Sequence, residues 1–148
     1  MKPVLKVNEI TVKYTPVKRV NQIINTSNDA YNVLMQFFPE DTIELQEQFV
    51  VLYLNKANKI IGGYKISVGG ITATVVDVRL ILSVALKTLA TGLILAHNHP
   101  SGNTKPSIAD QELTKRIKAA SDLMDISLLD HLIITNEAYL SFADEGFL

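Results

Sequence analysis

Short apolar runs that alternate with helical segments constrain the fold of this chain more than any other feature. The run LILA at residues 93–96 carries no polar side chain, follows a mostly apolar helical segment at 75–92, and precedes a second helical segment at 107–122. An uninterrupted apolar run of this kind is typical of an interior strand that is covered on both faces. Strands that alternate with helices predict an α/β fold, in which helices pack on a sheet.

A predicted hairpin determines the kind of sheet. Residues 47–55 (EQFVVLYLN) and 59–70 (KIIGGYKISVGG) are rich in β-formers, and Asn55–Asn58 supplies a turn between them. A further strand is expected at 127–135 (SLLDHLIIT). Hairpin strands are antiparallel, whereas strands joined through a helix are parallel. We therefore expect an α/β sandwich with a mixed sheet.

Capping residues predict where the helices begin and end. Residues 26–38 (TSNDAYNVLMQFF) begin with good N-cap residues and should form a helix that stops at Pro39. In the segment 75–92, Asp77 is the expected N-cap residue and Gly92 the expected C-cap residue.

The length and composition of the chain fit one globular domain. It has 148 residues, of which 47% are hydrophobic and 20% charged. Residues 1–25 alternate loosely and contain two prolines, which predicts an edge strand or an arm. We assign residues 1–43 to an N-terminal arm and helix that belong to, or pack on, the domain formed by residues 44–148. The absence of cysteine excludes thiol nucleophiles, zinc–cysteine fingers and iron–sulfur sites in this chain.

The N-terminus and the charge pattern bear on location and partners. The start, MKPVLKVNEI, lacks the apolar stretch of a signal peptide, and no run approaches the ~18 apolar residues of a membrane span. We therefore expect a cytoplasmic protein without a membrane partner. The net charge of −1 gives no overall attraction to nucleic acid. Residues 1–20 are nevertheless basic, with five cations against Glu9: Lys2, Lys6, Lys13, Lys18 and Arg19.

Two histidines follow the predicted interior strand. His97 and His99 are separated by one residue, so on an extended backbone both side chains point to one face. A loop containing Pro100 and Gly102 then leads to a helix that carries Asp110 in its first turn. Two histidines and one carboxylate, with a fourth position left to water, form a catalytic zinc pattern. Bound zinc lowers the pKa of its water to about 7 and so supplies a nucleophile at neutral pH.

Each of these residues also has a purely structural interpretation. Ser107 and Asp110 have the spacing of a capping box, which would need no metal. The cap and the ligand are compatible, since one carboxylate can accept first-turn amides and still offer an oxygen to a metal. The third histidine, His131, follows Asp130 within a predicted strand, so the two side chains face opposite ways and both cannot enter one site. We interpret His131 as structural.

The order of these residues resembles a known motif. Glu47, His97-x-His99 and Ser107-x-x-Asp110 resemble the JAMM (MPN+) metalloprotease motif. Four segments are similar to the RadC-like branch of that superfamily: HNHPSG at 97–102, PSIAD at 106–110, LLDHLIIT at 128–135 and SFADEGF at 141–147. The resemblance covers about residues 44–148 and implies a JAMM/cytidine-deaminase-like fold, which is a three-layer α/β/α sandwich with a mixed sheet.

The resemblance also implies roles for individual residues. It makes His97, His99 and Asp110 the zinc ligands, Glu47 the general base and Ser107 the donor to the oxyanion. Together these roles imply a zinc-dependent metallopeptidase or isopeptidase that acts on a peptide or protein substrate.

A second function class stays open. RadC-type relatives are associated with DNA repair and mobile elements, which would make the basic arm at residues 1–20 a phosphate contact. Many of those relatives carry a helix-hairpin-helix segment, whose glycine pattern residues 1–43 lack. A homodimer is also an open alternative. A nucleotide deaminase is disfavoured, because its H-x-E…P-C-x-x-C pattern needs cysteines.

The expected base is Glu47 rather than Glu44. Glu47 shares a face with Phe49 and the apolar residues that alternate after it, which places a carboxylate at the start of a half-buried strand. Glu44 ends an acidic stretch, EDTIE at 40–44, which fits a solvated turn.

Overall fold

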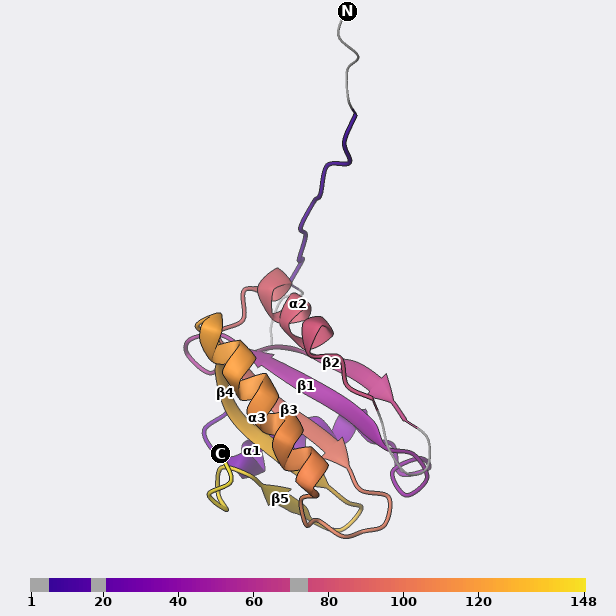
Figure 1. The fold of residues 1–148 in the computed structure, drawn as a ribbon. Helices are drawn as coiled ribbons and strands as arrows, with labels where there is room; N and C mark the ends of the chain where they lie inside the picture. The colour runs from indigo at the N-terminus through magenta and orange to yellow at the C-terminus, as the bar shows by residue number, and fades with distance from the viewer. Residues whose placement is uncertain (1–5, 17–20, 70–74) are drawn as a thin grey trace, which may run out of the picture.

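A computed structural model describes residues 6–16, 21–69 and 75–148 of the chain. Within these residues one sheet has the strand order β2-β1-β3-β4-β5 (Figure 1). The strands are β1 (Gln48–Leu54), β2 (Ile60–Val68), β3 (Gly92–Asn98), β4 (Ser127–Ile134) and β5 (Tyr139–Ser141). The helices are α1 (Ser27–Leu34), continued by the short 3-10 turn η1 (Met35–Phe37), then α2 (Val78–Thr88) and α3 (Ile108–Leu123).

The sheet is mixed, as the predicted hairpin required. Strand β1 is antiparallel to both β2 and β3, β3 is parallel to β4, and β5 is antiparallel to β4. Every residue of the central strands β1 and β3 is buried. Strands buried on both faces need cover on both faces, and the helices supply it.

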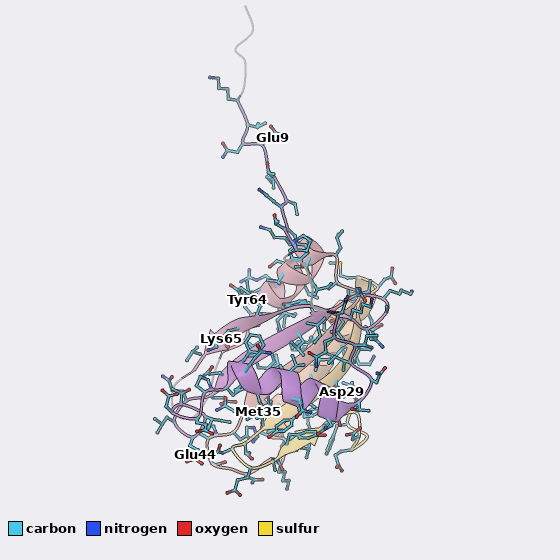
Figure 2. The ribbon with its side chains drawn as sticks, turned by 180° about the vertical axis from the view of Figure 1, so that it is seen from behind. Glu9, Asp29, Met35, Glu44, Tyr64 and Lys65 are labelled. Carbon is cyan, nitrogen blue, oxygen red and sulfur yellow. The ribbon has the colours of Figure 1, made fainter. Side chains whose placement is uncertain are left out.

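Two hydrophobic cores lie on opposite faces of the sheet and confirm the three-layer α/β/α arrangement. Helix α1 covers one face, and α2 and α3 cover the other (Figure 1). Figure 2, seen from behind, shows α1 with Asp29 at one end, and Tyr64 and Lys65 on the neighbouring strand β2. Alternate residues of β1 enter the two cores: Val50, Leu52 and Leu54 face α1, whereas Phe49, Val51 and Tyr53 face α2 and α3.

The helix starts agree with the expected caps, but one helix end does not. The side chain of Asp77 accepts a hydrogen bond from the amide of Arg79 and caps α2. The predicted C-cap at Gly92 is wrong, because α2 already ends at Leu89, which adopts a left-handed φ of 57°. Gly92 instead starts β3, where an added Cβ would lie 3.1 Å from Leu129 Cδ1. This glycine therefore serves close packing rather than a helix end.

The described residues of the N-terminal arm lie partly apart from the sheet and partly against it. Residues 6–16 form neither helix nor strand, and Figure 1 shows them extending away from the domain. Residues 22–24 of the predicted arm or edge strand do pair with the hairpin, through an antiparallel bridge between Ile23 and Lys59. Residues 1–5 and 17–20 lie outside the described residues. Helix α1 packs into the same core as β1 and β3, while the boundary expected at residue 44 stays a prediction. No helix among the described residues combines the length and hydropathy needed to cross a membrane.

The left-handed residue at the end of α2 allows a stability test. Leu89 is 82% exposed, so replacing it by glycine removes little buried surface. A non-glycine residue in this conformation costs about 1–2 kcal/mol, so Leu89→Gly should raise the free energy of unfolding by roughly 0.5–1 kcal/mol in urea denaturation. Leu86→Gly, three residues earlier within the same helix, should instead lower it by about 1 kcal/mol or more. Equal signs for the two variants would contradict the assigned helix end.

Candidate metal centre

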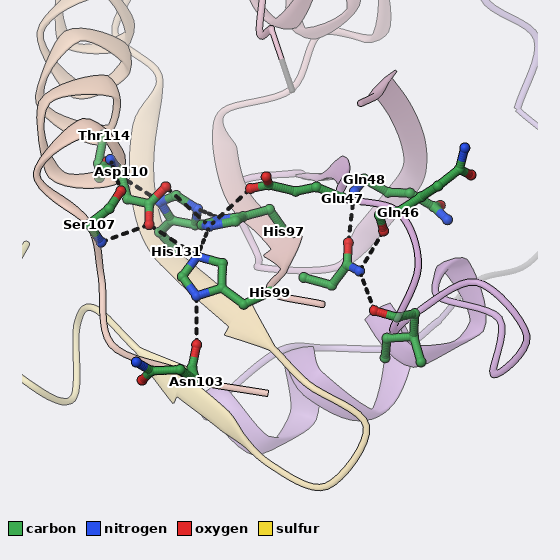
Figure 3. Close-up of polar contacts among 12 residues, drawn as sticks. Gln46, Glu47, Gln48, His97, His99, Asn103, Ser107, Asp110, Thr114 and His131 are labelled. Atoms are coloured by element: carbon green, nitrogen blue, oxygen red, sulfur yellow. Dashed lines mark hydrogen bonds and ion pairs between the residues drawn. The ribbon is translucent and has the colours of Figure 1, made fainter. Parts of the chain in front are cut away.

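The two predicted histidine ligands meet at the carboxyl end of β3. His97 is buried in the strand, and His99 follows directly after it with its amide donating to the carbonyl of Ile134 at 3.0 Å. The Nε2 atoms of the two imidazoles lie 3.0 Å apart (Figure 3). The spacing of one residue therefore brings both rings to one point, as the extended backbone predicts.

Asp110 reaches the same point from the first turn of α3. Its Oδ1 lies 3.3 Å from His97 Nε2, and its Oδ2 lies 3.1 Å from His99 Nε2. The same carboxylate accepts the amide of Ser107 at 2.9 Å, while Ser107 Oγ accepts the amide of Asp110 at 3.0 Å. Both interpretations of the Ser107–Asp110 pair thus hold together, because the capping box aims the carboxylate at the histidines.

Glu47 completes the group, whereas Glu44 does not belong to it. Glu47 immediately precedes β1, and the pairing of Phe49 with His97 brings it to the end of β3. It is half-buried, and its Oε1 lies 3.9 Å from His97 Nε2. Glu44 is exposed, and its Oε1 accepts from Asn136 Nδ2 at 3.4 Å.

The arrangement of these atoms fits a small divalent cation. One ligand atom from each of Glu47, His97, His99 and Asp110 can be chosen so that all lie within 4.8 Å of one another. Three separations, among the two imidazole nitrogens and the Asp110 oxygens, are 3.0, 3.1 and 3.3 Å. Ligands at 2.0–2.1 Å from a tetrahedral zinc ion are about 3.3–3.4 Å apart. The donor set can therefore hold such an ion with little movement.

Asn98, between the two histidines, clamps the segment that carries Glu47. Its side chain faces the other way and is fully buried. Its Oδ1 accepts the amide of Gln48, and its Nδ2 donates to the carbonyls of Ile43 and Gln46, each at 2.7 Å (Figure 3). The three bonds tie the chain on both sides of Glu47 to β3. The alternation of side chains along a strand predicts that Asn98 faces away from the two histidines, but it does not predict this function. A polar residue at the end of a buried strand was nevertheless a usable signal.

His131, interpreted as structural from the sequence, contacts a candidate ligand. Its Nε2 is 2.7 Å from His97 Nδ1, and its Nδ1 is 2.7 Å from the hydroxyl of Thr114 in α3. Asp130 faces away, as expected, and its carboxylate accepts from Ser141 Oγ and the amide of Ala143. Thr114 carried no sequence signal, because a threonine within a helix has many other uses.

Burial and the mutual contacts of these groups shift their pKa values. Burial raises the pKa of Glu47. For Asp110, burial opposes ionisation, but the hydrogen bonds from His97 and His99 outweigh it and hold the pKa well below its usual range. Burial also disfavours the charged form of His99, but its contacts with Asp110 and the Asn103 carbonyl prevail and raise its pKa. A carboxylate that stays ionised beside imidazoles is suited to bind a cation.

The fold and the site together define an α/β domain with a candidate single-metal centre at the carboxyl end of an interior strand. The chain belongs to the RadC-like JAB domain family, whose model matches residues 24–147 and thus includes α1. The family resemblance predicted from the sequence is confirmed.

Three similar proteins carry the name UPF0758 protein. A UPF0758 protein of Flavobacterium johnsoniae is 49% identical over 123 residues, which are 83% of this chain and 52% of that protein. A UPF0758 protein of Porphyromonas gingivalis is 46% identical over 126 residues, covering 84% of this chain and 54% of the relative. A UPF0758 protein of Haemophilus ducreyi is 39% identical over 139 residues, which are 94% of this chain and 61% of that protein. The chain therefore spans about half to three-fifths of the length of these relatives.

The raised pKa of His99 predicts how metal affinity changes with pH. A protonated imidazole cannot act as a ligand, whereas Asp110 stays ionised throughout the neutral range. Affinity for Co²⁺, measured by absorption titration, should therefore begin to fall while the pH is still above 6.5, the ordinary pKa of histidine. His97→Ala should bind no Co²⁺ at any of these pH values. An affinity that stays constant until well below 6.5 would contradict the assignment of His99 as a ligand.

Proposed function

We propose that this domain is a zinc-dependent hydrolase of amide or isopeptide bonds in peptides or proteins, with His97, His99 and Asp110 as the zinc ligands. The observation that carries the proposal is that these ligand atoms meet beside the carboxylate of Glu47. The two imidazole Nε2 atoms lie 3.0 Å apart, and each lies 3.1–3.3 Å from an oxygen of Asp110. Membership in the RadC-like JAB domain family supports it. A fourth position left to water and substrate distinguishes such a centre from a structural zinc site.

Glu47 is the proposed general base. A zinc ion held by His97, His99 and Asp110 would supply Lewis-acid activation of the substrate carbonyl and a water whose pKa is lowered to about 7. Glu47 accepts the proton of the attacking water and returns it to the leaving amine nitrogen, so the carboxylate is regenerated in each cycle. Burial raises the pKa of Glu47, which makes it a better proton acceptor than an exposed glutamate.

Ser107 is the proposed donor to the oxyanion. Its Oγ already accepts the amide of Asp110, so the hydroxyl proton is left for a substrate oxygen. The residue is exposed at the N-terminus of α3, where a developing negative charge is also favoured by the helix dipole. A donor held in place before the reaction stabilises the transition state without reorganisation.

Other partners predicted from the sequence remain proposals. Of the five basic residues that could contact nucleic acid, only Lys6 and Lys13 lie among the described residues, and both are exposed. A DNA-repair or mobile-element function would require binding that weakens steeply as salt rises. The homodimer and the cytoplasmic location likewise stay predictions.

The function is tested with Glu47→Gln, which keeps the shape of the side chain but removes its basicity. Purified protein loaded with Zn²⁺ is incubated with a peptide library, and cleavage that a chelator abolishes is measured by mass spectrometry. Glu47→Gln should retain zinc by elemental analysis but lose about 10²–10⁴ in rate.

Glu44→Gln is the matched control for this experiment, because Glu44 is exposed and lies outside the cluster. It should cleave like the unchanged protein. Activity that survives Glu47→Gln and is lost in Glu44→Gln would move the base to Glu44. Cleavage that persists after complete metal removal would overturn the proposed hydrolase.

Ser107→Ala tests whether Ser107 acts as an oxyanion donor in addition to capping α3. Loss of an N-cap costs about 1 kcal/mol of stability, whereas loss of an oxyanion donor costs about 10²–10³ in rate. Thr26→Ala is the control, because Thr26 caps α1 with the same kind of capping box. Both variants should lose similar stability in thermal unfolding, but only Ser107→Ala should lose rate on a cleaved peptide. Equal rates in the two variants would leave Ser107 as a cap alone.

A further inference from the structure

A chain of hydrogen bonds links two of the proposed ligands behind the metal centre. His97 Nδ1 lies 2.7 Å from His131 Nε2, and His131 Nδ1 lies 2.7 Å from Thr114 Oγ1. Thr114 Oγ1 also donates to the backbone carbonyl of Asp110 at 2.7 Å. Since the Asp110 carboxylate contacts His97 Nε2, the chain returns to its starting ring (Figure 3).

The surroundings of His131 keep its ring neutral. His131 is fully buried, with the ring of Phe142 stacked on one side and Phe49 edge-on at 5.6 Å. A charged imidazole is costly in a fully buried place of this kind, so the neutral ring is favoured. A neutral imidazole carries one proton, on either Nδ1 or Nε2, and its other nitrogen accepts.

A metal bound to His97 would determine the position of each proton in this series of hydrogen bonds. If Nε2 of His97 binds the ion, the ring proton must lie on Nδ1 and be donated to His131 Nε2. The His131 proton then lies on Nδ1 and is donated to Thr114, whose own proton goes to the Asp110 carbonyl. In the reverse arrangement, Thr114 donates to His131, His131 donates to His97, and a proton occupies the Nε2 atom that the metal needs.

In His99, a single hydrogen bond to a backbone carbonyl places the ring proton on Nδ1. Its Nδ1 lies 2.6 Å from the carbonyl oxygen of Asn103, which can only accept. The proton of neutral His99 is therefore on Nδ1, and its Nε2 presents a lone pair to the centre. His97 has no carbonyl in that place and depends on His131 for the same result.

We propose that His131 and Thr114 are positioning residues that hold the proton of His97 on Nδ1 and so keep its Nε2 available to the metal. The inference rests on the proposed metal centre and adds an outer layer to it. The two arrangements of the hydrogen bonds differ only in where the protons lie, so His97, His131 and Thr114 have the same charge in both. Outer hydrogen bonds of this kind typically change metal affinity by about 10–100-fold.

Thr114→Val tests the proposal, because valine keeps the shape of threonine but offers no acceptor to His131 Nδ1. An orphaned buried N–H is rarer in proteins than an orphaned acceptor, so the variant should favour the proton on His131 Nε2. Zn²⁺ affinity, measured by competition with a chromophoric chelator, should fall about 10–100-fold. Thr114→Ser restores the hydroxyl and should bind within about threefold of the unchanged protein, well inside that range.

Thr88→Val is the matched control. Thr88 lies in α2 and donates to the carbonyl of Val84 at 2.8 Å, the same bond one helical turn back, but no imidazole faces it. It should bind Zn²⁺ like the unchanged protein. Thermal unfolding of all metal-free variants shows whether each is folded.

A second measurement locates the imidazole protons directly and does not depend on hydrolytic activity. Nitrogen-15 NMR of the imidazoles should place the His131 proton on Nδ1 in the zinc-bound protein, and Thr114→Val should shift it toward Nε2 in the metal-free protein. A zinc-bound His131 protonated on Nε2, or a Thr114→Val variant with unchanged affinity and unchanged NMR signals, would overturn the proposal. Failure of the unchanged protein to bind Zn²⁺ would overturn the proposed function instead, while the metal-free NMR comparison would still decide the positions of the protons.

Discussion

The antiparallel pairing of β1 with β3 is the constraint on which the candidate metal centre depends. It sets Phe49 opposite His97 and brings Glu47 beside the end of β3. Both strands are buried along their whole length, and their alternate residues enter two different cores. A slip of one residue would turn each apolar side chain toward the wrong layer, so the cores hold the register. The same register therefore determines where Glu47 lies relative to His97.

The first turn of α3 both caps the helix and supplies a carboxylate to the candidate metal centre. Asp110 closes a capping box with Ser107 and, with the same carboxylate, lies 3.1–3.3 Å from two imidazole nitrogens. The helix dipole favours a negative charge at this position, which supports an ionised oxygen ligand. The centre therefore needs little rearrangement to accept a cation.

Polar groups buried around the histidines form two connected sets. Asn98 makes three hydrogen bonds to the segment around Glu47, and His131 bridges His97 and Thr114. Buried polar groups are costly unless each finds a partner, and here the partners connect the ends of four separate segments. Both sets orient groups of the proposed site.

Local patterns were sufficient for much of the fold and for the residues gathered at the site. The apolar strand at 93–96, the hairpin before it and the capped helix starts depend on neighbours in the chain. The sequence alone therefore determined the alternation of strands and helices and the mixed sheet. The His97-x-His99 spacing likewise determined that both rings share a face. Only the tertiary structure decided that α2 ends at Leu89, that Asn98 clamps a segment about 50 residues away, and that His131 lies against His97. Those contacts join residues distant in the chain, and their partners are set by strand order and packing, which no local periodicity encodes.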